Sequence, residues 1–234
     1  MFFDPKYLLF MIPGLLFMLW AQNKVRGSYK TFSQVRNAAN LTGAQVARRI
    51  LDSNGLSNVT IEPTQGELTD YYDPRTRSLH LSQGVYNMPS IAAMGIAAHE
   101  TGHAIQHARA FAPLQFRTAI VPIASFGSNL GIFVLIAGVF LHITGLAWAG
   151  VALFALATVF ALLTLPVEFD ASRRAKEALA NLGLTDGGLR GGEEGSGVAK
   201  VLDAAGWTYV AGFAASLLQL LYYVSLVGGM RRDD

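Results

Sequence analysis

The sequence predicts a mainly α-helical membrane protein, with about four transmembrane helices and a small α+β unit outside the bilayer. Of its 234 residues, 52% are hydrophobic and only 15% are charged, whereas soluble domains average about 25% charged residues. The charges also leave long gaps, because no Asp, Glu, Lys or Arg occurs from residue 118 to residue 167. About 20 helical residues cross a bilayer core, so this gap is long enough for two crossings.

Three uncharged windows predict the four transmembrane helices. The longest window is expected to turn near His142 and Gly145 and so to form a helical hairpin. The window near the N-terminus has a rival interpretation as a signal peptide, but bulky residues precede Ala21 where a cleavage site needs small ones. The predicted spans comprise residues 1–23, 119–141, 146–166 and 204–230, and the middle two form a transmembrane hairpin over 118–167.

Lysine and arginine residues near the spans indicate how the protein lies in the membrane. Lys24 follows the first span, Arg117 precedes the hairpin and Arg173 follows it. All three fall on one side of a four-span protein, and the positive-inside rule assigns that side to the cytoplasm. Both polar segments, 24–117 and 168–203, are therefore expected to face the cytoplasm.

The polar segments contain signals for short helices and strands. In the first segment, the predicted elements are a helix over 42–54, a strand over 59–61, a hairpin over 68–82 and a helix over 89–110. The short strand is expected to end at Pro63. The second segment begins as a helix that runs to about residue 182. Its glycine-rich stretch, 183–197, is expected to be a flexible connector rather than a lid.

Composition and charge exclude several functions. The net charge of +2 and the lack of a basic run argue against a nucleic-acid partner. The chain contains no cysteine, which excludes disulfides, cysteine-ligated zinc, iron–sulfur clusters and thiol catalysis.

The strongest motif lies within the helix predicted over 89–110. The run His99-Glu100-Thr101-Gly102-His103 has the pattern H-E-x-x-H. Residues four apart lie on one face of a helix, so both imidazoles can bind the same metal ion. Glu100, beside the first histidine, can then take a proton from a water molecule that the metal activates.

A zinc site of this kind needs a third protein ligand and an open position for water. Glu168 is the better candidate because it is the first charge after the long apolar stretch, where an acidic group is costly unless it is paired or coordinating. Asp203, at the start of the last span, competes for this role. His107 lies about 12 Å of helix rise from His99, which is too far for one metal, and the isolated His80 and His142 are more often structural.

Two stretches that flank the predicted hairpin carry a family resemblance, Ala97 to Gln106 before it and Pro166 to Ala175 after it. Together with Tyr72 to Thr76, they resemble the bacterial membrane-bound neutral zinc metallopeptidases of the YugP type, over nearly the whole chain. More distantly, the layout is similar to the HtpX and CAAX-protease metallopeptidases. Those families share a zinc-binding helix, a membrane hairpin and a glutamate ligand after it.

The resemblance implies a gluzincin-like zinc metalloendopeptidase in which His99, His103 and Glu168 bind Zn²⁺ and Glu100 is the general base. The small α+β unit would then be zincin-like, with an active-site helix and a short β-hairpin. The resemblance also implies protein or peptide substrates, with membrane proteins among the candidates. It places the enzyme as a multi-pass protein in the bacterial inner or plasma membrane.

One feature departs from the HtpX pattern, in which an aspartate follows the glutamate ligand four residues later. This chain has Ser172 at that position, and its nearest acid is Asp170. Metal-bound histidines usually donate a hydrogen bond through their other ring nitrogen. Ser172 and Asp170 are therefore both candidates for that partner.

The sequence predicts a zinc-dependent peptidase that acts at the membrane surface, and three other functions stay open: an intramembrane protease, a metal transporter and a scaffold. A site-2-type intramembrane protease would use Asp203 as a ligand, but Gln106 and Arg109 make the motif helix polar for a lipid-crossing segment. A metal transporter would draw ligands from several spans, and a scaffold would have no chemistry. For a peptidase, the strand near Ser78 to Ser82 is expected to hold an extended substrate by edge pairing.

Overall fold

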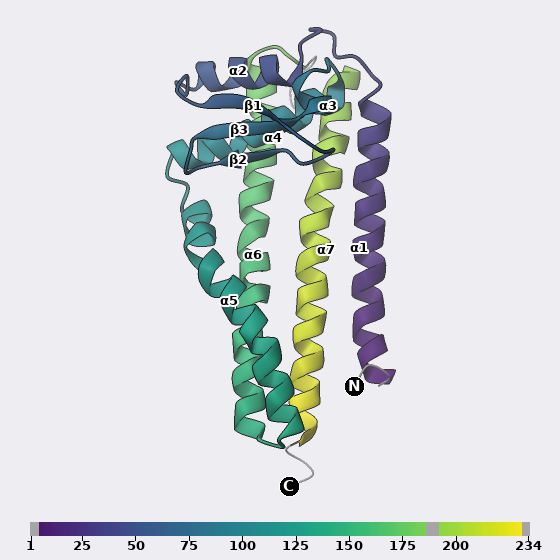
Figure 1. Cartoon of the computed structure of the whole chain (residues 1–234). Helices are drawn as coiled ribbons and strands as arrows, with labels where there is room; N and C mark the ends of the chain where they lie inside the picture. The colour runs from purple at the N-terminus through teal and green to yellow at the C-terminus, as the bar shows by residue number, and fades with distance from the viewer. Residues whose placement is uncertain (1–4, 186–191, 231–234) are drawn as a thin grey trace. The chain divides into compact units, whose positions relative to one another are not determined.

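The computed structural model describes residues 5–185 and 192–230. The chain divides into two compact units, and each is built from segments that are far apart in the sequence. The first, here called the helical unit, comprises Met1–Ala21, Gln115–Pro166 and Thr208–Asp234. The second, here called the α+β unit, comprises Gln22–Leu114 and Val167–Trp207. Figure 1 labels their helices and strands.

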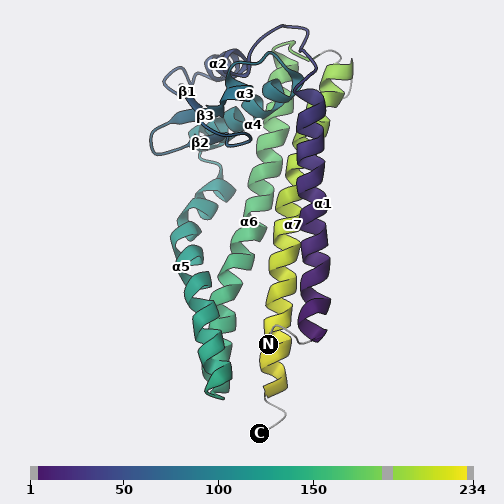
Figure 2. The same cartoon turned by 45° about the vertical axis from the view of Figure 1, so that its right-hand side comes forward.

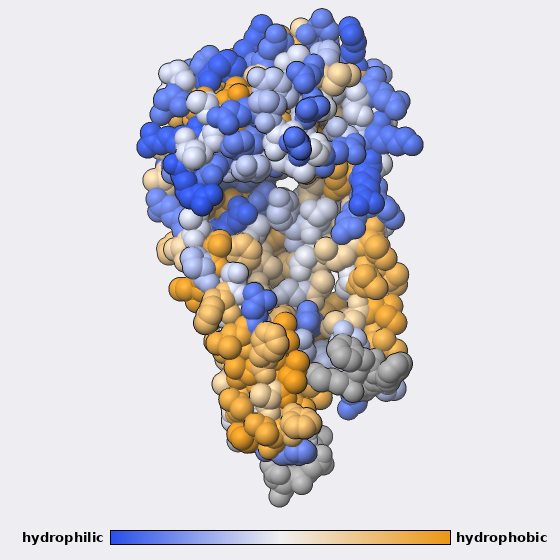
Figure 3. All heavy atoms as spheres, viewed as in Figure 1, coloured by the Kyte–Doolittle hydropathy of each residue, from blue (hydrophilic) through white to orange (hydrophobic). Residues whose placement is uncertain are grey.

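Within the described residues, four helices are long and apolar enough to cross a membrane: α1 (Pro5–Phe32), α5 (Ala112–Phe140), α6 (Thr144–Asn181) and α7 (Gly192–Met230). The predicted number of transmembrane helices is therefore confirmed. On α5, the side chains of Phe126, Phe133 and Phe140 are each more than 70% exposed. Figure 3 shows hydrophobic residues over much of the helical unit, with more polar residues between them. Exposed apolar surface of this extent marks a contact with lipid or with another apolar partner.

Small residues let the helices of the helical unit pack closely. A Cβ atom added at Gly138 would lie 2.3 Å from the main-chain nitrogen of Ala147, and one at Gly150 would lie 2.3 Å from that of Leu135. These glycines therefore bring α5 and α6 side by side, as Figures 1 and 2 show. Close approach at small residues is the usual basis of helix association in membranes.

The second hairpin helix was expected to end near residue 166, but α6 continues without a break to Asn181. Pro166 lies inside it. A proline removes one main-chain hydrogen bond and often ends a helix, yet helices of membrane proteins tolerate proline where the freed groups find other partners. One continuous helix therefore contains the end of the apolar stretch and Glu168.

The glycine-rich stretch over 183–197 is helical at its C-terminal end. Helix α7 begins at Gly192, and Glu193 and Glu194 lie in its first turn, where negative charge favours the helix dipole. The Glu194 carboxylate also accepts a 2.6 Å hydrogen bond from the main-chain N–H of Ala38. The prediction of a flexible connector is therefore wrong for residues 192–197, and residues 186–191 lie outside the described residues.

The α+β unit contains a three-stranded sheet of β1 (Thr60–Thr64), β2 (Tyr71–Asp73) and β3 (Ser78–Ser82). Its order is β1-β3-β2, with β3 parallel to β1 and antiparallel to β2. Pro63 does not end β1, because it pairs in register with Leu81 on an edge strand, where proline is tolerated. The expectation that Ser78 to Ser82 offers a free edge is wrong, because β3 is the central strand.

Helix α4 (Ile91–Ala108) is the centre of this unit, and α2 (Gly43–Ser53) and α3 (Gln83–Tyr86) precede it. Ser90 begins α4, since its hydroxyl accepts a 3.1 Å hydrogen bond from the N–H of Ala93. One side of α4 packs with α2 and the sheet, and another packs with α2, α6 and α7. The helix is therefore buried around most of its circumference, which holds its side chains in fixed directions.

Candidate metal centre

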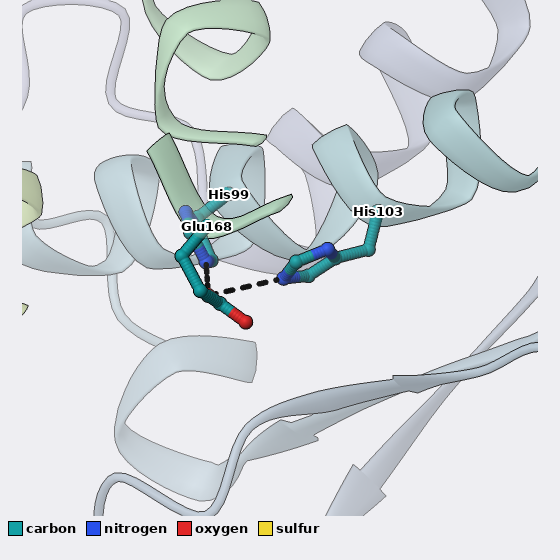
Figure 4. Close-up of side chains that lie close together, drawn as sticks. All are labelled: His99, His103 and Glu168. Carbon is teal, nitrogen blue, oxygen red and sulfur yellow. Dashed lines mark hydrogen bonds and ion pairs between the residues drawn. The ribbon is translucent and has the colours of Figure 1, made fainter. Parts of the chain in front are cut away.

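The two histidines of the H-E-x-x-H motif lie one turn apart on α4 and face the same carboxylate. Their rings meet edge to face, with centroids 4.8 Å apart. The Nε2 atom of His99 lies 3.3 Å from Oε2 of Glu168, and that of His103 lies 3.5 Å from the same oxygen. Figure 4 shows this convergence of α4 and α6 on one point.

Glu168 reaches the histidines because α6 approaches α4 at a glycine. A Cβ atom added at Gly102 would lie 2.6 Å from the main-chain oxygen of Ala171. The two backbones are thus in direct contact, one residue before His103. The Glu168 side chain is then only 3% exposed, and a buried carboxylate is costly unless a positive charge or hydrogen-bond donors compensate it.

The donor atoms of His99, His103 and Glu168 fit a zinc ion. All three lie within 4.8 Å of one another. Zinc binds histidine nitrogen and carboxylate oxygen at about 2.0–2.2 Å in a tetrahedral arrangement, which places neighbouring donor atoms about 3.4 Å apart. The 3.3 and 3.5 Å separations match that spacing. The set offers three ligands and leaves the fourth position for water or substrate.

Each imidazole also has a partner at its other ring nitrogen. His99 Nδ1 lies 3.1 Å from the hydroxyl of Ser172, and His103 Nδ1 lies 3.0 Å from Oε1 of Gln106. Of the two candidates for this role, Ser172 contacts a histidine directly, whereas Asp170 contacts Gln106 at 2.9 Å. Gln106 was not predicted as a site residue, although its position three residues after His103 places it on the same side of the helix.

Glu100 lies among these charged groups and is itself buried. Burial raises its pKa, and so do the charges of Glu168 and Asp70, while His103 and His99 act in the opposite direction. For His103, burial lowers the pKa, but its contacts with Glu168 outweigh that effect and leave the pKa raised. A carboxylate whose pKa is shifted towards neutrality suits a role in proton transfer.

Asp70 is a half-buried acid that the sequence did not single out. Its carboxylate accepts hydrogen bonds from the main-chain N–H of Ser82, at 2.7 Å, and from the Ser82 hydroxyl. Burial nevertheless raises its pKa. Asp70 thus holds the end of β3 and adds negative charge near Glu100.

The other residues considered as ligands lie elsewhere. Asp203 pairs with Lys176 at 3.2 Å, and its side chain is 61% exposed. His107 is 2.9 Å from the hydroxyl of Tyr72. His80 forms a hydrogen bond with the hydroxyl of Ser78 and stacks on the ring of Tyr71. His142 lies in the turn between α5 and α6.

Comparisons with known proteins agree with this chemistry. A family model described as "Putative neutral zinc metallopeptidase" matches residues 7–228. The chain is also 43% identical, over 215 residues, to the "Putative membrane protease YugP" of Bacillus subtilis (strain 168). That alignment covers 92% of this chain and 93% of the relative. No solved structure matches the chain.

Proposed function

Because the chain belongs to the neutral zinc metallopeptidase family, we propose that it is a membrane-bound, gluzincin-like metalloendopeptidase with His99, His103 and Glu168 as zinc ligands. The convergence of both Nε2 atoms on one oxygen of Glu168 carries this proposal. Neither the motif nor the glutamate alone would make a site, since two ligands from one helix leave zinc short of a third protein donor. Helix α6 supplies that donor.

The metal and Glu100 have separate roles in the proposed peptide hydrolysis. Bound zinc supplies Lewis acidity, which polarises a peptide carbonyl and makes water more acidic. Glu100 takes the proton of the attacking water and delivers it to the nitrogen of the leaving amine, so that the C–N bond breaks without releasing a free amide anion. Its raised pKa makes it a stronger base than an exposed glutamate.

The proposed location is the inner or plasma membrane of a bacterium, with the α+β unit on the cytoplasmic side. The distribution of lysine and arginine supports this orientation through the positive-inside rule. The proposed substrates are proteins or peptides. Membrane proteins are candidates because Glu168 directly follows the uncharged stretch 118–167, most of which lies in α6 and α5.

The structure disfavours two of the three alternatives that the sequence left open, the site-2-type protease and the metal transporter. A site-2-type protease would use Asp203, which instead pairs with Lys176 at an exposed position. A transporter would draw its ligands from several spans. Two of the three proposed ligands come from α4, which is not among the four helices apolar enough to span a membrane.

Replacing Glu100 by glutamine tests the mechanism. The Glu100→Gln variant keeps the size of the side chain and all three proposed ligands but removes the base. We expect the hydrolysis of a denatured protein substrate in detergent to fall by about 100-fold or more, with the zinc content unchanged. Glu62→Gln, at an exposed position of β1, is the control and should cleave normally. Normal cleavage by Glu100→Gln would refute the mechanism.

A further inference from the structure

Gln106 is a fully buried polar residue of α4, and the proposed mechanism assigns it no task. Its side chain makes three hydrogen bonds. Oε1 lies 3.0 Å from Nδ1 of His103, while Nε2 donates to the main-chain oxygen of Val167 at 2.8 Å and to Oδ2 of Asp170 at 2.9 Å. Both polar atoms of this amide are therefore engaged in hydrogen bonds.

The partners of Gln106 fix which way its amide points. The carbonyl oxygen of Val167 can only accept a hydrogen bond. The carboxylate of Asp170 also acts as an acceptor, because Arg173 and Arg174 both donate to it and a guanidinium has no acceptor atom. The NH₂ group of Gln106 must face these two acceptors, so its oxygen faces His103.

This direction in turn fixes the proton on His103. An amide oxygen can only accept, so Nδ1 of His103 must carry the hydrogen. In a neutral imidazole the other nitrogen, Nε2, is then left with its lone pair, and it is Nε2 that faces Glu168. His99 lacks this constraint, because the Ser172 hydroxyl beside its Nδ1 can either donate or accept.

We propose that Gln106 is a positioning residue that holds His103 in its Nδ1–H tautomer, ready to bind metal through Nε2. Asp170, held by Arg173 and Arg174, anchors Gln106 in turn. The inference rests on the proposed function, because it supposes that His103 is a zinc ligand. Its structural part, the tautomer of His103, does not depend on bound zinc and is measured separately.

The first experiment measures zinc affinity by competition with a chelator. Gln106→Met keeps a side chain of similar length but removes all three hydrogen bonds, and we expect its affinity to be about 10–100-fold weaker than that of the wild type. Thr101→Val is the matched control. Thr101 is also fully buried in α4, and its hydroxyl bonds only to the main-chain oxygen of Ala98 among the described contacts. An unchanged affinity in Gln106→Met would overturn the proposal.

The second experiment reads the tautomer by ¹⁵N NMR of histidine-labelled, zinc-stripped protein, at a pH that keeps the imidazole neutral. We expect the hydrogen of His103 to lie on Nδ1 in the wild type, and we expect Gln106→Met to show a mixture of the Nδ1–H and Nε2–H tautomers. Hydrogen on Nε2 in the wild type would overturn the inference even if zinc binds. A correct tautomer in a protein that fails to bind zinc would instead contradict the proposed function.

Asp170→Asn provides a second test of the same hydrogen-bonded chain in case Gln106→Met does not fold. This variant preserves an acceptor for Gln106 but removes the charge that holds the two arginines. We expect a smaller loss of zinc affinity in the same direction. An affinity equal to that of the wild type would contradict the anchoring role of Asp170.

Discussion

The proposed zinc site depends on three donor atoms, two of them from residues four apart in α4. The spacing of His99 and His103 was enough to predict that they share a face, because helix geometry is local. Glu168 was harder to identify, since its place depends on how α6 packs against α4. Gln106 was not predicted, because its partners Val167 and Asp170 come from α6 and depend on the same packing.

Ser172 offers a test at the scale of one hydrogen bond. Ser172→Ala removes the hydroxyl beside Nδ1 of His99 and leaves every proposed ligand in place. Partners of this kind orient a metal-bound imidazole, so we expect zinc affinity to fall by about tenfold, measured by chelator competition. Ser216→Ala, which removes a hydroxyl bonded to Thr158 in the helical unit, should bind zinc like the wild type. Equal affinity in the two variants would show that Ser172 does not support the site.

At the scale of elements, the sequence predicted the kinds of element better than their limits. Uncharged windows predicted four spanning helices, but the helices continue into charged segments because helical hydrogen bonding does not depend on side-chain charge. Proline was misleading at Pro63, which was expected to end its strand. Pro63 is tolerated on the edge strand β1, and Pro166 lies within α6. Both outcomes depend on the surrounding structure, which local sequence does not contain.

Two glycines of α4 provide a matched test of helix packing. A Cβ atom at Gly102 would lie 2.6 Å from the main-chain oxygen of Ala171, whereas one at Gly95 would have its nearest contact at 3.5 Å, with Val198. Gly102→Ala should push α6 away, cost about 1–3 kcal/mol of stability and reduce zinc binding. Gly95→Ala should be neutral or stabilising, by up to about 1 kcal/mol.

Thermal unfolding and the zinc content of the purified variants check this comparison. A Gly102→Ala protein that unfolds at the temperature of the wild type and keeps its zinc would show that close contact between α4 and α6 is not required for the site.

At the scale of the whole molecule, the proposed orientation can be tested because the chain contains no cysteine. A single cysteine introduced at Ser57, an exposed position of the α+β unit, would be the only thiol. If this unit faces the cytoplasm, a membrane-impermeant thiol reagent should label the protein only after the cells are lysed. Labelling in intact cells would reverse the orientation.

The central claim is that zinc is held by His99, His103 and Glu168, and metal analysis tests it most directly. Wild-type protein, Glu168→Ala and Asp203→Ala are purified in parallel, and their zinc content is measured after dialysis. We expect equimolar zinc in the wild type and in Asp203→Ala, whose substitution removes only an exposed ion pair, and little zinc in Glu168→Ala. Retention of zinc by Glu168→Ala together with its loss from Asp203→Ala would contradict the claim and favour the site-2-type alternative.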